Sequence, residues 1–147
     1  MSAVRIGVIS DTHGVLRSQA REILRGGQQI VHAGDIDHPL ILRELEAIAP
    51  TTAVRGNMSV LKVHERIQVD RWAILLVHNI NDLPDLEGTD IVIFGHSHKF
   101  LQENRGGVLF LNPGSAGPRR FNIPISMAVL SLGETITVEP MLLKSQP

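Results

Sequence analysis

Seven side chains of kinds that bind metal ions follow apolar stretches of the sequence. They comprise two aspartates, four histidines and one asparagine, namely Asp11, His13, Asp35, Asn57, His78, His96 and His98. Carboxylate, imidazole and amide groups suit Mn²⁺, Zn²⁺, Fe or Ni²⁺. Seven such groups exceed the number that one ion takes, so the set predicts two ions. Two cations about 3.5 to 4 Å apart repel each other, so we expect a shared carboxylate between them.

The last two histidines of this set are one residue apart, in the stretch "DIVIFGHSHKF" at 90–100. Side chains at positions i and i+2 of extended backbone point the same way, with about 6.5 Å between their Cα atoms. This spacing suits a pair of ions, so each histidine is expected to serve a different metal. A single histidine at a strand end is more often a hydrogen-bonded core or rim residue. The metal interpretation therefore rests on all seven residues together. Tight turns at three of them are indicated by Gly34, Gly56 and Gly95.

The first third of the chain alternates predicted strands and helices. Strands are predicted at 4–10, 29–34 and 51–56, and helices at 14–26 and 38–49. The inward face of the first helix is predicted to comprise Val15, Leu16, Ala20, Ile23 and Leu24. Alternation of this kind favours a parallel sheet with right-handed crossovers.

The rest of the chain is predicted to consist mostly of strands joined by short turns. These strands cover 64–70, 71–78, 89–96, 106–112, 125–132 and 135–143. Gly133 and Glu134 mark a hairpin between the last two, and the group predicts a second, more antiparallel sheet. The expected fold class is α/β, an αββα four-layer sandwich with two mixed β-sheets flanked by helices. The candidate metal ligands all lie at carboxyl ends of predicted strands, where α/β sheets bind ligands, so we expect them to converge.

Composition limits the classes of protein to which the chain can belong. Its 147 residues are 43% hydrophobic, which predicts one domain over 1–147. The formal net charge of −1 indicates no general affinity for nucleic acid or for an anionic membrane. Cysteine is absent, so disulfides, cysteine zinc sites and a thiol nucleophile are excluded. Without a membrane-length apolar stretch or a signal-peptide pattern, we expect a soluble cytoplasmic protein, with homo-oligomer formation left open.

Five motifs occur in order along the chain: "SDTHG" from residue 10, "GD" at 34–35, "GN" at 56–57, a histidine ending the strand at 71–78, and "GHSH" at 95–98. In this order they resemble the motifs of the calcineurin-like metallophosphoesterase superfamily. The segments "VHAGD", "VRGN" and "NPGS" are most similar to its small bacterial and archaeal phosphodiesterase branch. That branch also resembles the eukaryotic retromer subunit of the same fold.

The resemblance implies the αββα fold and a dinuclear metal centre that hydrolyses phosphoester bonds. It implies that one ion is bound by Asp11, His13 and His98, that the other is bound by Asn57, His78 and His96, and that Asp35 bridges the two. The expected catalytic residues are Asp35, Asn57 and His78.

The expected activity is that of a phosphodiesterase acting on a small phosphodiester through a hydroxide that bridges two metal ions. Mn²⁺ is the expected metal, with Ni²⁺, Zn²⁺ or Fe as alternatives. A phosphomonoesterase on the same site and a non-catalytic metal-containing binding scaffold remain alternative functions.

Three departures from the superfamily pattern bear on this activity. Met58 and Ser59 stand where many members have a histidine that protonates the leaving group and an acidic residue. At the fourth motif only His78 is present, followed by Asn79, where members often have His-Gly-His. The chain has no room between its motifs for a cap domain, so we expect an open site.

Further polar residues near the motifs have other expected roles. Arg119 and Arg120 follow "NPGSAGP" and could bind a substrate phosphate, because guanidinium matches phosphate geometry. His32 is either a hydrogen-bond partner of a metal ligand or a satisfied strand histidine, and it is a suspect for the missing proton donor. A solvated helix face is the expected place for Arg17, Arg21 and Arg25.

Overall fold

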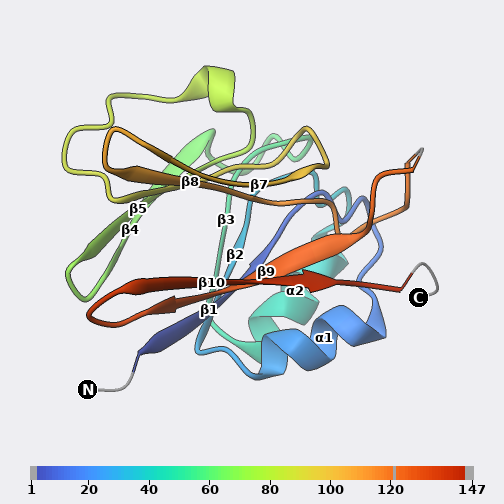
Figure 1. The fold of residues 1–147 in the computed structure, drawn as a ribbon. Coiled ribbons are helices and arrows are strands. Elements are labelled where there is room, and N and C mark those ends of the chain that lie inside the picture. Colours follow the sequence, from blue (N-terminus) through green and yellow to red (C-terminus); the bar gives the residue numbers. More distant parts are fainter. Residues whose placement is uncertain (1–2, 121, 145–147) are drawn as a thin grey trace.

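Two five-stranded β-sheets packed face to face form the centre of the molecule (Figure 1). The computed structural model describes residues 3–120 and 122–144. The first sheet has the strand order β10-β9-β1-β2-β3 and the second has the order β4-β5-β6-β8-β7. Both sheets mix parallel and antiparallel pairs, which confirms the predicted α/β fold with two mixed sheets.

The first sheet contains the predicted parallel unit. Its elements are β1 (Val4–Ile9), α1 (Ser18–Arg25), β2 (Gln29–His32), α2 (Pro39–Ile48) and β3 (Thr51–Ala53). β1 pairs in parallel with β2, and β2 pairs in parallel with β3. Both helices lie on the face of this sheet that is turned away from the second sheet (Figure 1). There Leu24 of α1 and Leu45 of α2 pack with Ile9 and Ile30 in one buried cluster.

The last two strands join this first sheet, which the sequence did not predict. β9 (Ser126–Leu132) pairs antiparallel with β1, and β10 (Ile136–Leu142) pairs antiparallel with β9. The predicted hairpin between β9 and β10 is confirmed. Their predicted place in the second sheet is wrong, because β9 covers the free edge of β1 instead. Nothing local in an apolar strand specifies which edge it will pair with.

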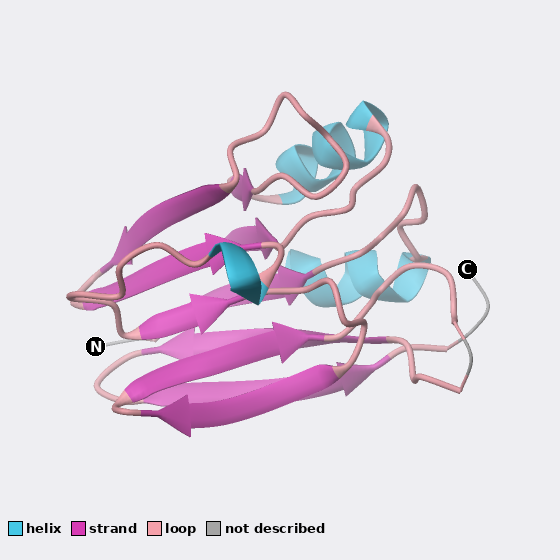
Figure 2. Ribbon diagram, turned by 90° about the horizontal axis from the view of Figure 1, so that it is seen from above, coloured by secondary structure: helices cyan, strands magenta, loops and turns pink. Residues whose placement is uncertain are grey.

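The second sheet is built from the middle of the chain. Its strands are β4 (His64–Val69), β5 (Trp72–Val77), β6 (Ile91–Ile93), β7 (Phe100–Arg105) and β8 (Val108–Pro113). β7, at the sheet edge, was not predicted, because its second half is polar and exposed. The outer face of this sheet is covered by the segment that contains the 3₁₀ helix η1 (Ile80–Asp82), as the view from above shows (Figure 2). A single short turn therefore stands where a flanking helix was expected.

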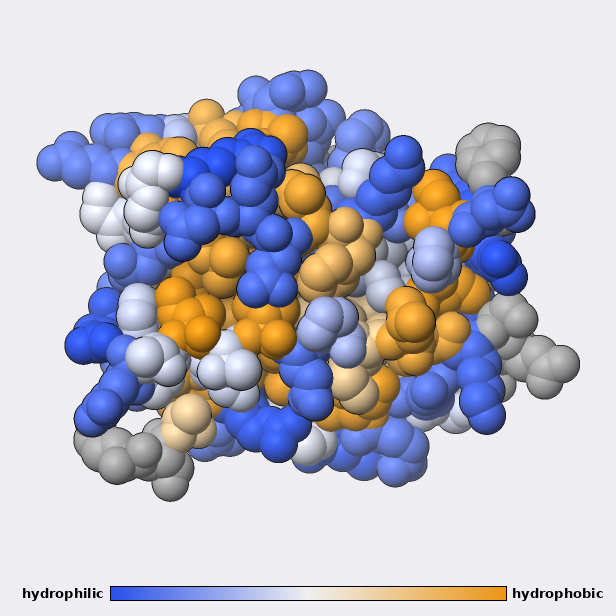
Figure 3. Space-filling view, in the orientation of Figure 1, coloured by the Kyte–Doolittle hydropathy of each residue, from blue (hydrophilic) through white to orange (hydrophobic). Residues whose placement is uncertain are grey.

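The main hydrophobic core lies between the two sheets. Ile6 and Val8 of β1 belong to the same buried cluster as Ile74 and Leu76 of β5, and all four are at most 1% exposed. In the space-filling view, hydrophobic residues gather along the middle of this side, with hydrophilic residues above and below (Figure 3). Among the described residues, no helix has the length and hydropathy needed to cross a membrane.

The first helix begins later than predicted. Its first residue is Ser18, so Val15 and Leu16 lie in the preceding loop, although Leu16 is buried there. The predicted helix would start at Gly14, but the backbone there is left-handed, with φ of 46° at His13 and 81° at Gly14. A helix cannot continue through such residues, and the periodic apolar pattern alone does not reveal them.

Candidate metal centre

The loops that follow β1 and β2 are joined along their backbones. Asp11 N–H donates to the Gly34 carbonyl, His13 N–H to the Asp35 carbonyl, and Gly14 N–H to the Ile36 carbonyl, each at 2.9 Å. These bonds continue the parallel pairing of the two strands beyond their ends. They bring residues 11–14 beside residues 34–36, although the two segments lie more than twenty positions apart in the chain.

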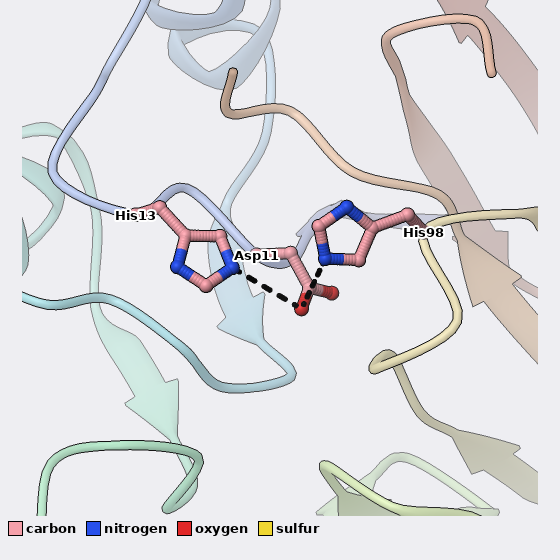
Figure 4. A group of neighbouring side chains, drawn as sticks. All are labelled: Asp11, His13 and His98. Atoms are coloured by element: carbon pink, nitrogen blue, oxygen red, sulfur yellow. Dashed lines mark ion pairs between the residues drawn. The ribbon is translucent and has the colours of Figure 1, made fainter. Parts of the chain in front are cut away.

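Asp11 lies at the centre of one group of candidate ligands (Figure 4). Its Oδ1 atom is 3.4 Å from Nε2 of His98 and 3.9 Å from Nε2 of His13. Its Oδ2 atom accepts hydrogen bonds from the Ser10 hydroxyl at 2.6 Å and from the His96 N–H at 3.2 Å. The two hydrogen bonds to Oδ2 thus orient the carboxylate, and Oδ1 faces the imidazoles.

Asp35 and His78 form a second group together with Asp11. Oδ2 of Asp35 is 3.2 Å from Nε2 of His78 and 3.6 Å from Nε2 of His13. Nδ1 of His78 lies 2.7 Å from the Ala33 carbonyl, an acceptor, so Nδ1 carries the hydrogen. In the neutral ring, Nε2 therefore presents a lone pair toward both aspartates, as a metal ligand must.

The remaining two candidate ligands lie at the border of this cluster. The His96 side chain is exposed, and its ring centroid lies 5.2 Å from that of His78. Asn57 is also exposed; its side-chain carbonyl accepts a hydrogen bond from the Asp37 N–H at 3.3 Å, and its amide donates to the Asp37 carboxylate. The structure thus brings Asp11, His13, Asp35, His78 and His98 into direct proximity, with His96 and Asn57 beside them.

Two features of this cluster fit divalent metal ions. Among the described residues, Asp11 Oδ1, His13 Nε2 and His98 Nδ1 are buried and have no hydrogen-bond partner. A buried carboxylate oxygen without a donor costs free energy, and a bound cation removes that cost. Left-handed backbone occurs at five of the seven candidate ligands, namely Asp11, His13, Asp35, His96 and His98. Backbone strain of this kind gathers at functional sites, where the surrounding structure maintains it.

Close contacts explain two of the glycines that precede candidate ligands. A Cβ atom at Gly34, where φ is 105°, would lie 2.7 Å from Nδ1 of His78. One at Gly56 would lie 2.0 Å from Oδ1 of Asp35. Any larger residue at either position would displace a candidate ligand.

The end of β8 and the loop after it support the cluster, a role that the sequence did not predict. Asn112 is fully buried and donates to the Gly95 carbonyl at 3.0 Å and to the Ser97 hydroxyl at 3.1 Å. The Ser115 hydroxyl donates to the Asp11 carbonyl at 3.1 Å. These contacts fix the "GHSH" segment and the first loop. A polar Asn-Pro-Gly-Ser run directly after an apolar strand was the available signal.

His32 has both ring nitrogens occupied. Its Nδ1 accepts from the Gly34 N–H at 3.0 Å, so Nε2 carries the hydrogen and donates to the Thr12 hydroxyl at 3.0 Å. Burial lowers the pKa of His32 to about 3, and the neighbouring His78 and His13 add to this effect. The ring is a satisfied strand histidine that also joins two ligand-bearing loops. It does not have a free, titrating proton for a leaving group.

The arginines differ in their surroundings. Arg17, expected on a solvated face, is 4% exposed and donates to the carbonyls of Ala116 and Gly117, at 3.3 and 2.9 Å. Arg119 and Arg120 are exposed. Burial lowers the pKa of His98, Asp11 raises it, and the positive charge of Arg120 lowers it further. Both arginines line a small hollow with His98, and Arg119 also lines an apolar cavity of about 190 Å³ with Pro124, Ile125, Leu142 and Leu143.

Comparisons with known proteins identify relatives of this chain and of its fold. The family model of the calcineurin-like phosphoesterase superfamily domain matches residues 4–135. A probable metallophosphoesterase of Methanothermobacter thermautotrophicus is 35% identical, over 91% of this chain and 90% of its own. A solved archaeal phosphodiesterase is 22% identical with a TM-score of 0.83, over 95% of this chain and 100% of that one. Wild-type Vps29 of Entamoeba histolytica, solved with Zn²⁺, is 25% identical with a TM-score of 0.73, over 95% and 99% of the two chains.

The sequence match and the fold together identify the family. The chain belongs to the calcineurin-like phosphoesterase superfamily, as its ordered motifs had predicted. Two groups of side chains in the structure are candidate sites for the metal ions of such a phosphoesterase.

Proposed function

We propose that this protein is a dinuclear metal-dependent phosphodiesterase. One observation carries the proposal: the buried Oδ1 atom of Asp11 has no hydrogen-bond donor among the described residues and lies within 3.9 Å of the Nε2 atoms of His13, His78 and His98. A cation beside this oxygen would offset its buried negative charge, and Asp11 belongs to both candidate metal groups.

The seven residues of the motifs would hold these ions. One group comprises Asp11, His13 and His98, and the other comprises Asn57, His78 and His96, with Asp35 between the two. Two divalent ions bound here would lower the pKa of water into the neutral range and offset the negative charge of a phosphodiester. Asp35 fits the central place, because its Oδ2 atom lies within 3.6 Å of both His13 and His78.

The chain itself holds the ligands ready for this chemistry. The Ala33 carbonyl keeps the hydrogen of His78 on Nδ1, so Nε2 needs no reorganisation when a metal ion binds. The Ser10 hydroxyl and the His96 N–H keep the Asp11 carboxylate in one orientation. Ligands positioned before binding reduce the free-energy cost of assembling the site.

The leaving group receives no proton from the usual position. Met58 is half-buried and packs against the cluster of apolar residues under the two helices. A thioether cannot donate a proton. We propose that the preferred substrates are small phosphodiesters whose leaving groups depart without protonation.

Substrate binding is assigned to Arg120 more than to Arg119. The positive charge of Arg120 acts on His98, a candidate ligand, so a phosphate at the metal centre would also feel it. Arg119 shares a hollow with His98 and Arg120, but it also extends to an apolar cavity beside Leu142. Arg120 is thus the better candidate for a contact with the substrate phosphate.

Mn²⁺ is the proposed metal, with Ni²⁺, Zn²⁺ and Fe as alternatives. The mixed histidine and carboxylate set is poorly suited to Mg²⁺, which prefers octahedral oxygen ligands. The Zn²⁺ bound by the Entamoeba Vps29 supports the view that this fold accepts a transition metal.

The test is hydrolysis by metal-free protein reconstituted separately with Mn²⁺, Ni²⁺, Zn²⁺ and Mg²⁺. We expect kcat/KM for bis(p-nitrophenyl) phosphate to exceed that for p-nitrophenyl phosphate, with Mn²⁺ or Ni²⁺ more effective than Mg²⁺. A preference for the monoester would favour a phosphomonoesterase. Bound metal without hydrolysis of either ester would favour the non-catalytic scaffold that the likeness to Vps29 allows.

A further inference from the structure

Asp37, two residues after the predicted bridging aspartate, contacts two candidate ligands at once. Its Oδ1 atom lies 3.2 Å from Nδ1 of His13. The same carboxylate accepts from the side-chain amide of Asn57, and the Asp37 N–H donates to the Asn57 side-chain carbonyl. None of the five sequence motifs had indicated a role for this residue.

The His13 ring has carboxylates beside both of its nitrogen atoms. Its Nε2 atom faces Asp11 and Asp35, at 3.9 and 3.6 Å, and its Nδ1 atom faces Asp37. A carboxylate beside one imidazole nitrogen keeps the hydrogen there, and the lone pair of the other nitrogen then points to the metal. Asp37 stands on the side of the ring opposite the proposed metal.

The backbone at Asp37 is also suited to this position. Its φ is 72°, in the left-handed region that aspartate, asparagine and glycine adopt more readily than other residues. The backbone bonds between residues 13–14 and 35–36 hold the two loops together, and so keep Asp37 beside His13.

We propose that Asp37 is a positioning residue that orients one ligand of each metal ion. It holds His13, assigned to one ion, in the tautomer with hydrogen on Nδ1, and it holds the side chain of Asn57, assigned to the other. The inference rests on the proposed function insofar as it takes His13 and Asn57 to be metal ligands. Removing Asp37 should therefore weaken the binding of both ions without removing either.

Substitutions at Asp37 must preserve its backbone conformation. Asp37→Gly removes the carboxylate and tolerates the positive φ, whereas alanine would add strain. Asp37→Asn keeps an acceptor oxygen without the charge and should act as a conservative rescue. Asp70→Gly is the matched control, because Asp70 is also exposed, has a φ of 50°, and lies in the turn at the opposite end of β5 from His78.

The first measurement is titration of metal-free protein with Mn²⁺ by calorimetry. Loss of a residue that orients a ligand typically weakens metal binding about 10- to 100-fold, and we expect this loss at both sites in Asp37→Gly. Asp37→Asn should lose less, and Asp70→Gly should bind as the wild type does. Loss of one whole site in Asp37→Asn would overturn the proposal by making Asp37 a ligand, and unchanged affinity in Asp37→Gly would also overturn it.

The second measurement needs no metal. Nitrogen NMR shifts of the His13 ring in metal-free protein at pH 8 distinguish the two neutral tautomers. We expect hydrogen on Nδ1 in the wild type and in Asp70→Gly, and a mixture of tautomers in Asp37→Gly. The same tautomer in all three proteins would contradict the role of Asp37. This outcome is independent of phosphodiesterase activity, so the proposed function can fail while the positioning role stands, and the reverse also holds.

Discussion

The two carboxylate oxygens of Asp11 have different roles. One oxygen takes two donors from the protein, and the other is buried and faces three imidazoles. Asp35 differs, since its carboxyl group is partly exposed and approaches only His13 and His78 among these rings. We infer that Asp11 anchors the centre, while Asp35 closes it on the solvent side.

Substitution of Asp35 should have a larger effect on metal content than substitution of His98, a histidine assigned to one ion. We expect Asp35→Ala to abolish activity and to lose both ions, because they would then repel each other without an anion between them. His98→Ala should weaken one site chiefly. Elemental analysis after dialysis against metal-free buffer measures both, and an Asp35→Ala protein that keeps two tightly bound ions would refute the bridging role.

Met58 stands where many members of the superfamily have a histidine that protonates the leaving group. Without an acid at this position, kcat/KM should rise steeply as the pKa of the leaving group falls, so aryl diesters should react far faster than alkyl diesters. Met58→His should flatten this dependence and accelerate poor leaving groups by up to about 10²-fold, provided that the imidazole reaches the leaving oxygen. A series of substituted phenyl and alkyl diesters, with metal content checked in both proteins, measures the slope. A shallow slope in the wild type would mean that another group already donates the proton.

The site is made from loops that follow the carboxyl ends of the strands. A candidate ligand follows within four residues of the end of β1, β2, β3, β5 and β6, and the supporting loop follows β8. The loop after β8 packs so closely on the first loop that a Cβ atom at Gly117 would lie 2.3 Å from the Asp11 carbonyl oxygen. Arg17, just before α1, binds that same loop.

Arg17 should therefore contribute more to the free energy of unfolding than Arg21 and Arg25 of α1. Arg17→Ala leaves buried carbonyls without their donor, and such a loss typically costs about 1 to 3 kcal/mol in the free energy of unfolding. Arg25→Ala is the control, because Arg25 is exposed and its ion pair with Glu22 lies on the helix surface; surface changes of this kind usually stay within about 0.5 kcal/mol. Urea unfolding of the metal-free proteins decides this, and equal midpoints for the two variants would contradict the anchoring role.

The neutral, buried His32 makes the free energy of unfolding of the molecule depend on pH. His32 has a pKa of about 3 in the folded protein and 6.5 as its ordinary value. Below pH 6.5 the unfolded chain binds a proton there that the folded protein does not bind. Its contribution to stability is thus complete above that pH and decreases as the pH falls toward about 3.

The expected loss from this single group is about 1.4 kcal/mol per pH unit, or about 2 kcal/mol between pH 6.5 and pH 5. Urea unfolding of metal-free wild type and His32→Asn at pH 8 and pH 5 tests it, with the smaller pH dependence expected in the variant. NMR resonances of the His32 ring in the wild type provide a second test, since they should remain those of a neutral imidazole at pH 5. A ring that titrates near pH 6.5 would contradict the prediction.

The sequence alone determined the kinds of chemistry available and most of the elements that carry them. Residue types such as Asp11 and His98, and their places after apolar runs, are local properties that can be read without a structure. The pattern of β1, β2 and β3 with two helices between them is equally local, because hydrophobic periodicity and short connections specify it. Five ordered motifs were enough to predict the family correctly.

Only the tertiary structure decided which segments meet. The pairing of β9 with β1, the burial of Arg17 and the double contact of Asp37 all join residues that are distant in sequence. An apolar strand can pair with the edge of more than one strand. A charged side chain is buried only when another segment of the same chain packs around it. Left-handed backbone at His13 and Gly14 delayed the start of the predicted helix for the same reason, since bonds to a neighbouring loop outweigh local helical preference.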